Sequence, residues 1–190
     1  MNLTDFIKLL FFASVVVWIL PAIRQCKSYM FDFFLVLALV DPITLFFGII
    51  TKTNMPQWLY ALFIYLLIIS ITTEDILKKL KYVFIALPLL FVILIPYMTT
   101  EYYHILFICM DLVILFVFLR WLITSYVEKK RLNIFYLMLV FYILTVILKF
   151  FNLLIGFADA SAFFIITSIA QILFGLFFSI VREDESGIAH

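Results

Sequence analysis

The chain has 190 residues, of which 67% are hydrophobic, 19% are aromatic and 13% are charged. This composition, with a mean hydropathy of +1.25, lies outside that of soluble globular domains and indicates a membrane protein. The formal net charge of +1 gives no reason to expect nucleic acid as a partner. Four glycines against 24 phenylalanines and 10 tyrosines argue against a fold that depends on glycine contacts between helices, and favour packing by bulky side chains.

Apolar segments of membrane-spanning length recur along the whole chain. A spanning helix needs about 20 apolar residues, because each residue rises by roughly 1.5 Å and the hydrocarbon core is roughly 30 Å thick. The connectors between the segments are short, so successive helices are expected to be antiparallel neighbours. We predict seven spans, at residues 5–20, 31–50, 58–73, 82–97, 105–124, 132–154 and 163–181.

The first predicted span opens the chain, and the apolar run ends near Leu20. No small-residue cleavage site follows it, so a removable signal peptide is the weaker interpretation. Trp18 falls near the end of this span, where an aromatic side chain is typical of the membrane–water interface.

The second predicted span carries a carboxylate and a helix breaker near its middle, at Asp41 and Pro42. A carboxylate at this depth is costly unless it is protonated, paired or hydrated. Pro42 has no N–H, so it is expected to kink the helix and to leave the carbonyl of Ala38 without its helical partner. We therefore expect Asp41 to lie at the floor of a polar pocket.

The third span ends at the acidic pair Glu74 and Asp75, which is typical of a solvated helix end. The fourth span contains Pro88 and has Pro96 near its end. Because prolines interrupt helices, this segment is the weakest of the seven.

Polar side chains also interrupt the fifth, sixth and seventh spans. Asp111 and Lys149 each lie about seven residues from the same membrane surface, which places both roughly 10 Å deep. Because their helices are consecutive, we predict that this acid and this base form an ion pair. Asn152 lies one helical turn from Lys149, and Gln171 lies near the middle of the seventh span. The alternative is structural: scattered polar contacts between helices, with Lys149 extending outward to the interface.

Basic residues in the connectors predict the orientation of the chain, because cytoplasmic loops carry an excess of Lys and Arg. Nine basic residues fall on one predicted side, against Lys8 and Lys52 on the other. The amino terminus is therefore expected outside the cell membrane and the carboxyl terminus in the cytoplasm. The nine residues are Arg24, Lys27, Lys78, Lys79, Lys81, Lys129, Lys130, Arg131 and Arg182.

Motifs for catalysis and for cofactors are missing from the sequence. His104 and His190 are the only histidines and fall at segment edges, so neither a metal cluster nor paired haem ligands is expected. The seventh span has no lysine, which excludes a retinal Schiff base. The sequence thus favours a protein that is not an enzyme and that holds no cofactor.

The sequence therefore predicts an all-α, multi-pass protein of the cell membrane, with residues 1–181 as one compact seven-helix domain and residues 182–190 as a short cytoplasmic tail.

Three functions stay open. The favoured one is binding or transport of a small molecule or ion; the others are a sensory or signalling module that acts through a partner, and a structural subunit of a membrane complex. Besides the lipid bilayer, other membrane proteins or a second copy of the chain are the expected partners. The predicted ligand or ion pocket consists of Asp41, Pro42, Asp111, Lys149, Asn152 and Gln171.

Overall fold

The computed structural model describes residues 3–53 and 55–183, and within these ranges all regular structure is helical. Eight α-helices lie in this part of the chain, together with a π-helical turn that continues α2 and a 3₁₀ turn that continues α5. Their bounds are α1 Leu3–Arg24, α2 Phe31–Phe46, η1 Phe47–Thr51, α3 Gln57–Ser70, α4 Glu74–Lys79, α5 Lys81–Leu94, η2 Ile95–Tyr97, α6 Thr100–Lys129, α7 Ile134–Ile155 and α8 Ala160–Ile180.

Four helices in the described residues are long and apolar enough to cross a membrane, namely Phe31–Thr51, Thr100–Lys129, Ile134–Ile155 and Ala162–Ile180. Three further apolar helical segments are shorter: Leu9–Arg24, which is part of α1, Gln57–Ser70 and Lys81–Tyr97. The structure therefore supports the prediction of an all-helical membrane protein. The count of seven crossings stays a prediction, because four helical segments of the described residues have both the length and the composition of a full span.

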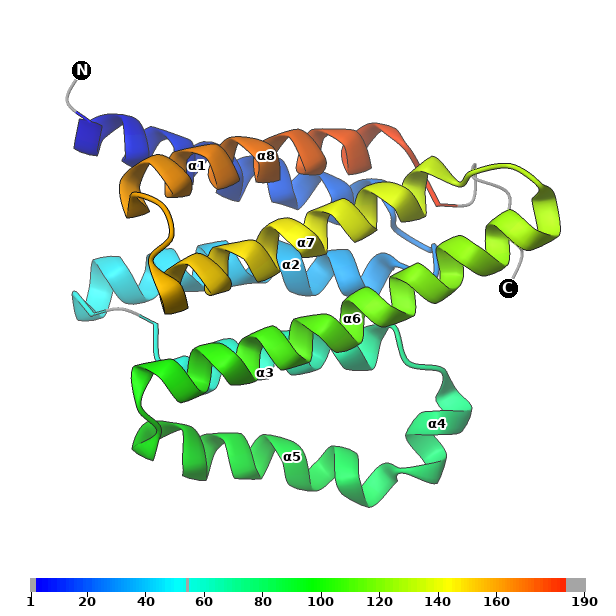
Figure 1. Cartoon of the computed structure of the whole chain (residues 1–190), viewed down its shortest axis with the longest axis horizontal. Helices are drawn as coiled ribbons and strands as arrows, with labels where there is room; N and C mark the ends of the chain where they lie inside the picture. Colours follow the sequence, from blue (N-terminus) through cyan, green and yellow to red (C-terminus); the bar gives the residue numbers. More distant parts are fainter. Residues whose placement is uncertain (1–2, 54, 184–190) are drawn as a thin grey trace.

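Six of the helices form a closed ring in which each packs against the next (Figure 1). The order around this helical ring is α1, α2, α3, α6, α7 and α8, and α8 packs again on α1. α1 and α8 run parallel, as shown by the hydrogen bond that Arg24 Nε at the end of α1 donates to the carbonyl of Ile180 at the end of α8 (3.3 Å). α3 and α6 also run parallel, since α4 and α5 come between them in the chain: the rings of Tyr60 near the start of α3 and Phe107 near the start of α6 lie 5.3 Å apart. The remaining neighbouring pairs, which short connectors join, are antiparallel.

A glycine sets the close approach of α1 and α8. A Cβ atom on Gly175 would lie 2.7 Å from Cγ1 of Val17 and 3.6 Å from the indole of Trp18. The small number of glycines predicted a fold that does not depend on glycine contacts between helices, yet this one contact needs a glycine, because the total number of glycines says nothing about where one is placed.

An aromatic core fills one half of the helical ring. Phe34 and Phe178 have ring centroids 5.1 Å apart, and Phe135 lies 5.4 Å from Phe178. Phe33 and Phe118 pack edge to face at 5.3 Å. All five side chains are buried, so bulky packing of the predicted kind holds these helices together.

α5 lies outside the helical ring, at the edge of the bundle, where it packs on α3 (Figure 1). Tyr65 Oη on α3 donates to the carbonyl of Phe84, but no side chain of α5 itself is buried among the described residues. Pro88 lies inside this helix and Pro96 in the 3₁₀ turn that ends it. The short helix α4 between α3 and α5 was not predicted, because it holds only 6 residues and four of them are charged.

The basic connectors gather at one end of the bundle (Figure 1). Tyr29 Oη donates to the carbonyl of Ile71 (3.4 Å), and Arg182 Nη2 donates to the carbonyl of Cys26 (3.1 Å). These contacts join the segments 25–30, 71–73 and 181–183, and the nine basic residues lie on or beside the connectors at this end. The side of the membrane that this end faces stays a prediction.

Candidate ligand pocket

α2 carries Asp41 into the interior of the helical ring. The helix continues across Pro42 as far as Phe46, although proline cannot donate to the carbonyl of Ala38. One carboxylate oxygen of Asp41, Oδ2, accepts a hydrogen bond from Ser14 Oγ on α1 (3.0 Å). The acid that the sequence placed alone at mid-depth therefore has a hydrogen-bond donor from the neighbouring helix.

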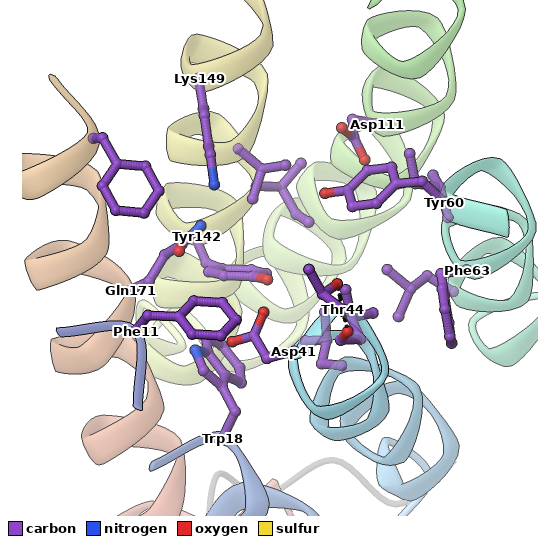
Figure 2. Close-up of a pocket in the computed structure, with 17 residues that line it drawn as sticks. Phe11, Trp18, Asp41, Thr44, Tyr60, Phe63, Asp111, Tyr142, Lys149 and Gln171 are labelled. Carbon is purple, nitrogen blue, oxygen red and sulfur yellow. Dashed lines mark hydrogen bonds between the residues drawn. The ribbon is translucent and has the colours of Figure 1, made fainter. Parts of the chain in front are cut away.

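Side chains from all six helices of the ring enclose a cavity of about 260 Å³ (Figure 2). Within a helix, the lining residues follow the spacing of three or four that places side chains on one face. The cavity therefore lies at the centre of the ring, next to the aromatic core. Its lining residues are Phe11, Trp18, Leu37, Val40, Asp41, Thr44, Tyr60, Phe63, Ile64, Leu67, Asp111, Tyr142, Ile143, Val146, Lys149, Phe164 and Gln171.

Four of the six predicted pocket residues line this cavity. Asp41, Asp111, Lys149 and Gln171 reach it from α2, α6, α7 and α8, respectively. Figure 2 shows them arranged around the same space, with Lys149 directed toward Tyr142 and Gln171. The sequence suggested one depth for Asp111 and Lys149 and the middle of the span for Gln171, and the structure brings all of them to one cavity with Asp41.

The other two predicted residues are not part of the cavity lining. Pro42 belongs to the helix that forms the wall. Asn152 is buried in the last turn of α7: its Oδ1 accepts from the N–H of Ala158 (2.9 Å), and its carbonyl accepts from the N–H of Gly156 (2.7 Å). Gly156 has φ +67°, the left-handed conformation that commonly ends a helix. Asn152 thus shapes the connector between α7 and α8 rather than the pocket.

The predicted ion pair between Asp111 and Lys149 is not formed. Asp111 is 2% exposed, and its Oδ2 has no hydrogen-bond partner among the described residues. The ammonium of Lys149 lies 5.4 Å from the ring centroid of Phe164 on α8, and its electrostatic interaction is with Asp41. Consecutive helices do bring the two residues to the same cavity, but Lys149 leaves α7 toward α8 and α2, whereas Asp111 lies beside Tyr60 (Figure 2).

Sequence reasoning missed the aromatic and hydroxyl groups of the pocket. Trp18, expected at the interface, is 4% exposed and packs on Tyr142 with a centroid distance of 4.9 Å. The reason is that α1 continues to Arg24, so Trp18 lies inside the helix. The spacing of Phe11, Ser14 and Trp18 is the signal that could have found this face, since residues three and seven apart share one side of a helix.

The cavity offers no metal centre among the residues that the structure describes. No group of three or more His, Cys, Asp or Glu side chains there is placed to hold a metal ion. What the cavity does offer is a pair of carboxylates, one ammonium, the amide of Gln171 and the rings of Tyr60 and Tyr142.

A second polar cluster lies at the basic end of the bundle, around Gln25 and Glu183, which are 0% and 1% exposed. The carboxylate of Glu183 accepts from the N–H of Met30 and from Tyr136 Oη, both at 3.1 Å. Gln25 Oε1 accepts from the N–H of Glu183 (3.1 Å), and Gln25 Nε2 donates to the carbonyl of Val181 (2.8 Å). The start of the predicted tail is therefore packed on the bundle.

The remainder of that tail, residues 184–190, lies outside the described residues, and so does the predicted edge position of His190.

Comparison of the chain with protein-family models, with curated proteins and with solved structures gave no match. The function must therefore be argued from the geometry of the pocket itself.

Proposed function

We propose that this chain is a membrane-embedded protein that binds a small solute in the cavity of the helical ring and carries it across the membrane. The observation that supports the proposal best is the convergence of Asp41, Asp111 and Lys149, from three different helices, on one cavity. Charged side chains are expensive inside a membrane, and those that occur there commonly pair, relay protons or contact a substrate. A cavity between helices of a bundle is also a common place for a ligand.

The proposal includes seven crossings, with the amino terminus outside. The cavity then lies in the outer half of the membrane, because its residues lie toward the end of the bundle opposite the basic connectors. Phe11 and Tyr60 are near the starts of α1 and α3, and Lys149 is near the end of α7. A solute would reach this cavity from the outer face.

α5 supports a second candidate, a subunit or signalling module that acts through another membrane protein. No side chain of this helix is buried in the described structure; Tyr82 at its start and Tyr97 in the 3₁₀ turn that follows it are 86% and 88% exposed. Such a helix offers a whole face to lipid or to a partner helix. A stoichiometric complex isolated from native membranes would favour this candidate, and a single monodisperse protein would favour the carrier.

The test of the binding proposal is thermal unfolding of the purified protein in lipid nanodiscs with four small solutes. The solutes are benzylamine, benzoate, phenylalanine and benzyl alcohol, which are cationic, anionic, zwitterionic and neutral. At least one should raise the unfolding temperature in a saturable manner, because a ligand that binds only the folded state stabilises it. If none does, the binding proposal is wrong.

A pair of matched variants shows whether the solute occupies this cavity. Val146 lines it, so Val146→Phe should remove the ligand-dependent rise in unfolding temperature by filling the space. Val113 is 50% exposed on α6, so Val113→Phe should keep the rise. An unchanged rise in Val146→Phe would place the binding elsewhere.

A further inference from the structure

The charges around the cavity are unbalanced, and this inference about the solute rests on the proposed function. Among the described residues that line the cavity, the charged side chains are Asp41, Asp111 and Lys149. Two carboxylates and one ammonium leave one negative charge in excess when all three are ionised. A bound monovalent cation would cancel that charge, whereas an anion would double the imbalance.

The two carboxylates are satisfied to different degrees. Asp41 receives the hydroxyl of Ser14 and interacts with the charge of Lys149. Asp111 is more deeply buried, at 2% exposed, and its Oδ2 has no hydrogen-bond donor in the described structure. A buried carboxylate without a donor or counter-charge is strongly unfavourable. The missing positive group therefore belongs beside Asp111 rather than beside Asp41.

The walls around Asp111 are mainly apolar and aromatic. Tyr60 lies next to the carboxylate, and Tyr142 faces the same space (Figure 2). Ile143 and Val146 add aliphatic surface on α7. Aromatic faces attract organic cations, whereas a bare inorganic cation prefers oxygen ligands and gains nothing from the apolar side chains that make up most of this wall.

We propose that the cavity binds a compact organic cation, with its ammonium group at Asp111 and its apolar body between Tyr60, Tyr142 and the aliphatic side chains of α7. The cavity of about 260 Å³ sets the size. Since a cavity of roughly 150 Å³ accepts benzene, this one has room for about ten non-hydrogen atoms. An aromatic or branched aliphatic primary amine has the required charge, shape and size.

Two other occupants satisfy the same carboxylate and give different results. A proton alone would neutralise Asp111 and leave no requirement for an amine. An inorganic cation such as Na⁺ would balance the charge but would not depend on an apolar body.

The test compares benzylamine with benzyl alcohol, which has nearly the same shape and no charge, by thermal shift titration in nanodiscs at constant ionic strength. Benzylamine should bind at least ten times more tightly than benzyl alcohol to the parent protein. Asp111→Asn should weaken benzylamine binding at least tenfold. The control Asp32→Asn, an identical change at an exposed position of α2, should leave it unchanged.

Each other outcome overturns the inference. Equal binding of benzyl alcohol and benzylamine would mean that shape alone is recognised, and this comparison needs no variant. Unchanged benzylamine binding in Asp111→Asn would remove Asp111 from the site. Stabilisation by Na⁺ but not by benzylamine would identify an inorganic cation, and an unfolding temperature that rises in Asp111→Asn without any amine binding would identify a proton. Binding of benzoate or phenylalanine alone would overturn the organic cation while leaving the proposed binding function intact.

Discussion

At the scale of single residues, Asp41 is the carboxylate whose charge interacts with that of Lys149, whereas Asp111 forms no ion pair with this lysine. Ser14 donates to Asp41 at 3.0 Å, and Lys149 interacts electrostatically with this same carboxylate. Asp111 has no donor to Oδ2 in the described residues. The two carboxylates of the cavity should therefore respond differently when Lys149 is removed.

The first prediction at this scale is a pair of double-mutant cycles on unfolding free energy. Asp41→Asn with Lys149→Met should show a coupling of about 0.5–3 kcal/mol, the range for residues that interact. Asp111→Asn with the same Lys149→Met should be additive within about 0.5 kcal/mol. Denaturant or thermal unfolding in one lipid environment measures all the variants. The reverse pattern, with coupling at Asp111 and additivity at Asp41, would contradict the electrostatic arrangement described above.

The same residues show how far a sequence can predict a site. Charges inside apolar segments are conspicuous, so Asp41, Asp111 and Lys149 could be selected without a structure. Their pairing could not, because it depends on the direction in which each side chain leaves its helix. Ser14 carries no such signal, since a lone serine in an apolar helix is common.

At the scale of helices, the contact between α1 and α8 depends on the missing side chain of Gly175. These helices are the first and last in the described residues, and their contact closes the ring around the cavity. Val17, the residue that a Cβ atom at Gly175 would meet, is β-branched and has little rotational freedom in a helix. The contact therefore has little capacity to absorb an extra methyl group.

We predict that Gly175→Ala lowers the unfolding free energy by about 1–3 kcal/mol, the usual effect of overpacking. Gly48→Ala is the matched control, because no described atom lies within 4 Å of the position that its Cβ would take. This control should be neutral or stabilise by about 0.5–1 kcal/mol, since alanine favours helix more than glycine does. Thermal unfolding measures the difference in stability between the two variants. Equal stability would mean that α1 and α8 are not tightly packed at Gly175.

Apolar runs predicted where the long helices lie, but not how they end or which of them meet. The run near residue 20 suggested a helix end, whereas α1 continues to Arg24 and buries Trp18. α4 was hidden by its charges, although Glu74 and Lys78 form an exposed ion pair at 2.9 Å along it. Periodicity reports the faces of one helix, whereas helix ends and distant contacts depend on neighbours in space.

At the scale of the whole molecule, the helical ring and the basic end together favour seven crossings. Short connectors predict that consecutive helices are neighbours, which holds for most of the ring. They do not predict that α5 is left outside, or that α3 packs directly on α6. A ring of six helices around a polar cavity requires that α3, although it is the shortest of the six, lies at the same depth as its neighbours.

The decisive topology experiment is a reporter that is active only outside the membrane, fused after Lys52, Lys81, Glu101 or Lys130. Crossings by only the four candidate spans Phe31–Thr51, Thr100–Lys129, Ile134–Ile155 and Ala162–Ile180 would leave α3, α4 and α5 on the outer side, so that the reporter after Lys81 would be active. Seven crossings place Lys81 inside, where basic residues accumulate, and predict a silent reporter there.

The hydrogen bond from Tyr29 to Ile71 favours seven crossings, because it joins the connector after α3 to the connector that precedes α2. Fusions after Lys52 and Glu101 should be active and the one after Lys130 silent in either case, so they serve as controls. An active reporter after Lys81 would reduce the crossings to four, and an inverted pattern at all four sites would reverse the orientation.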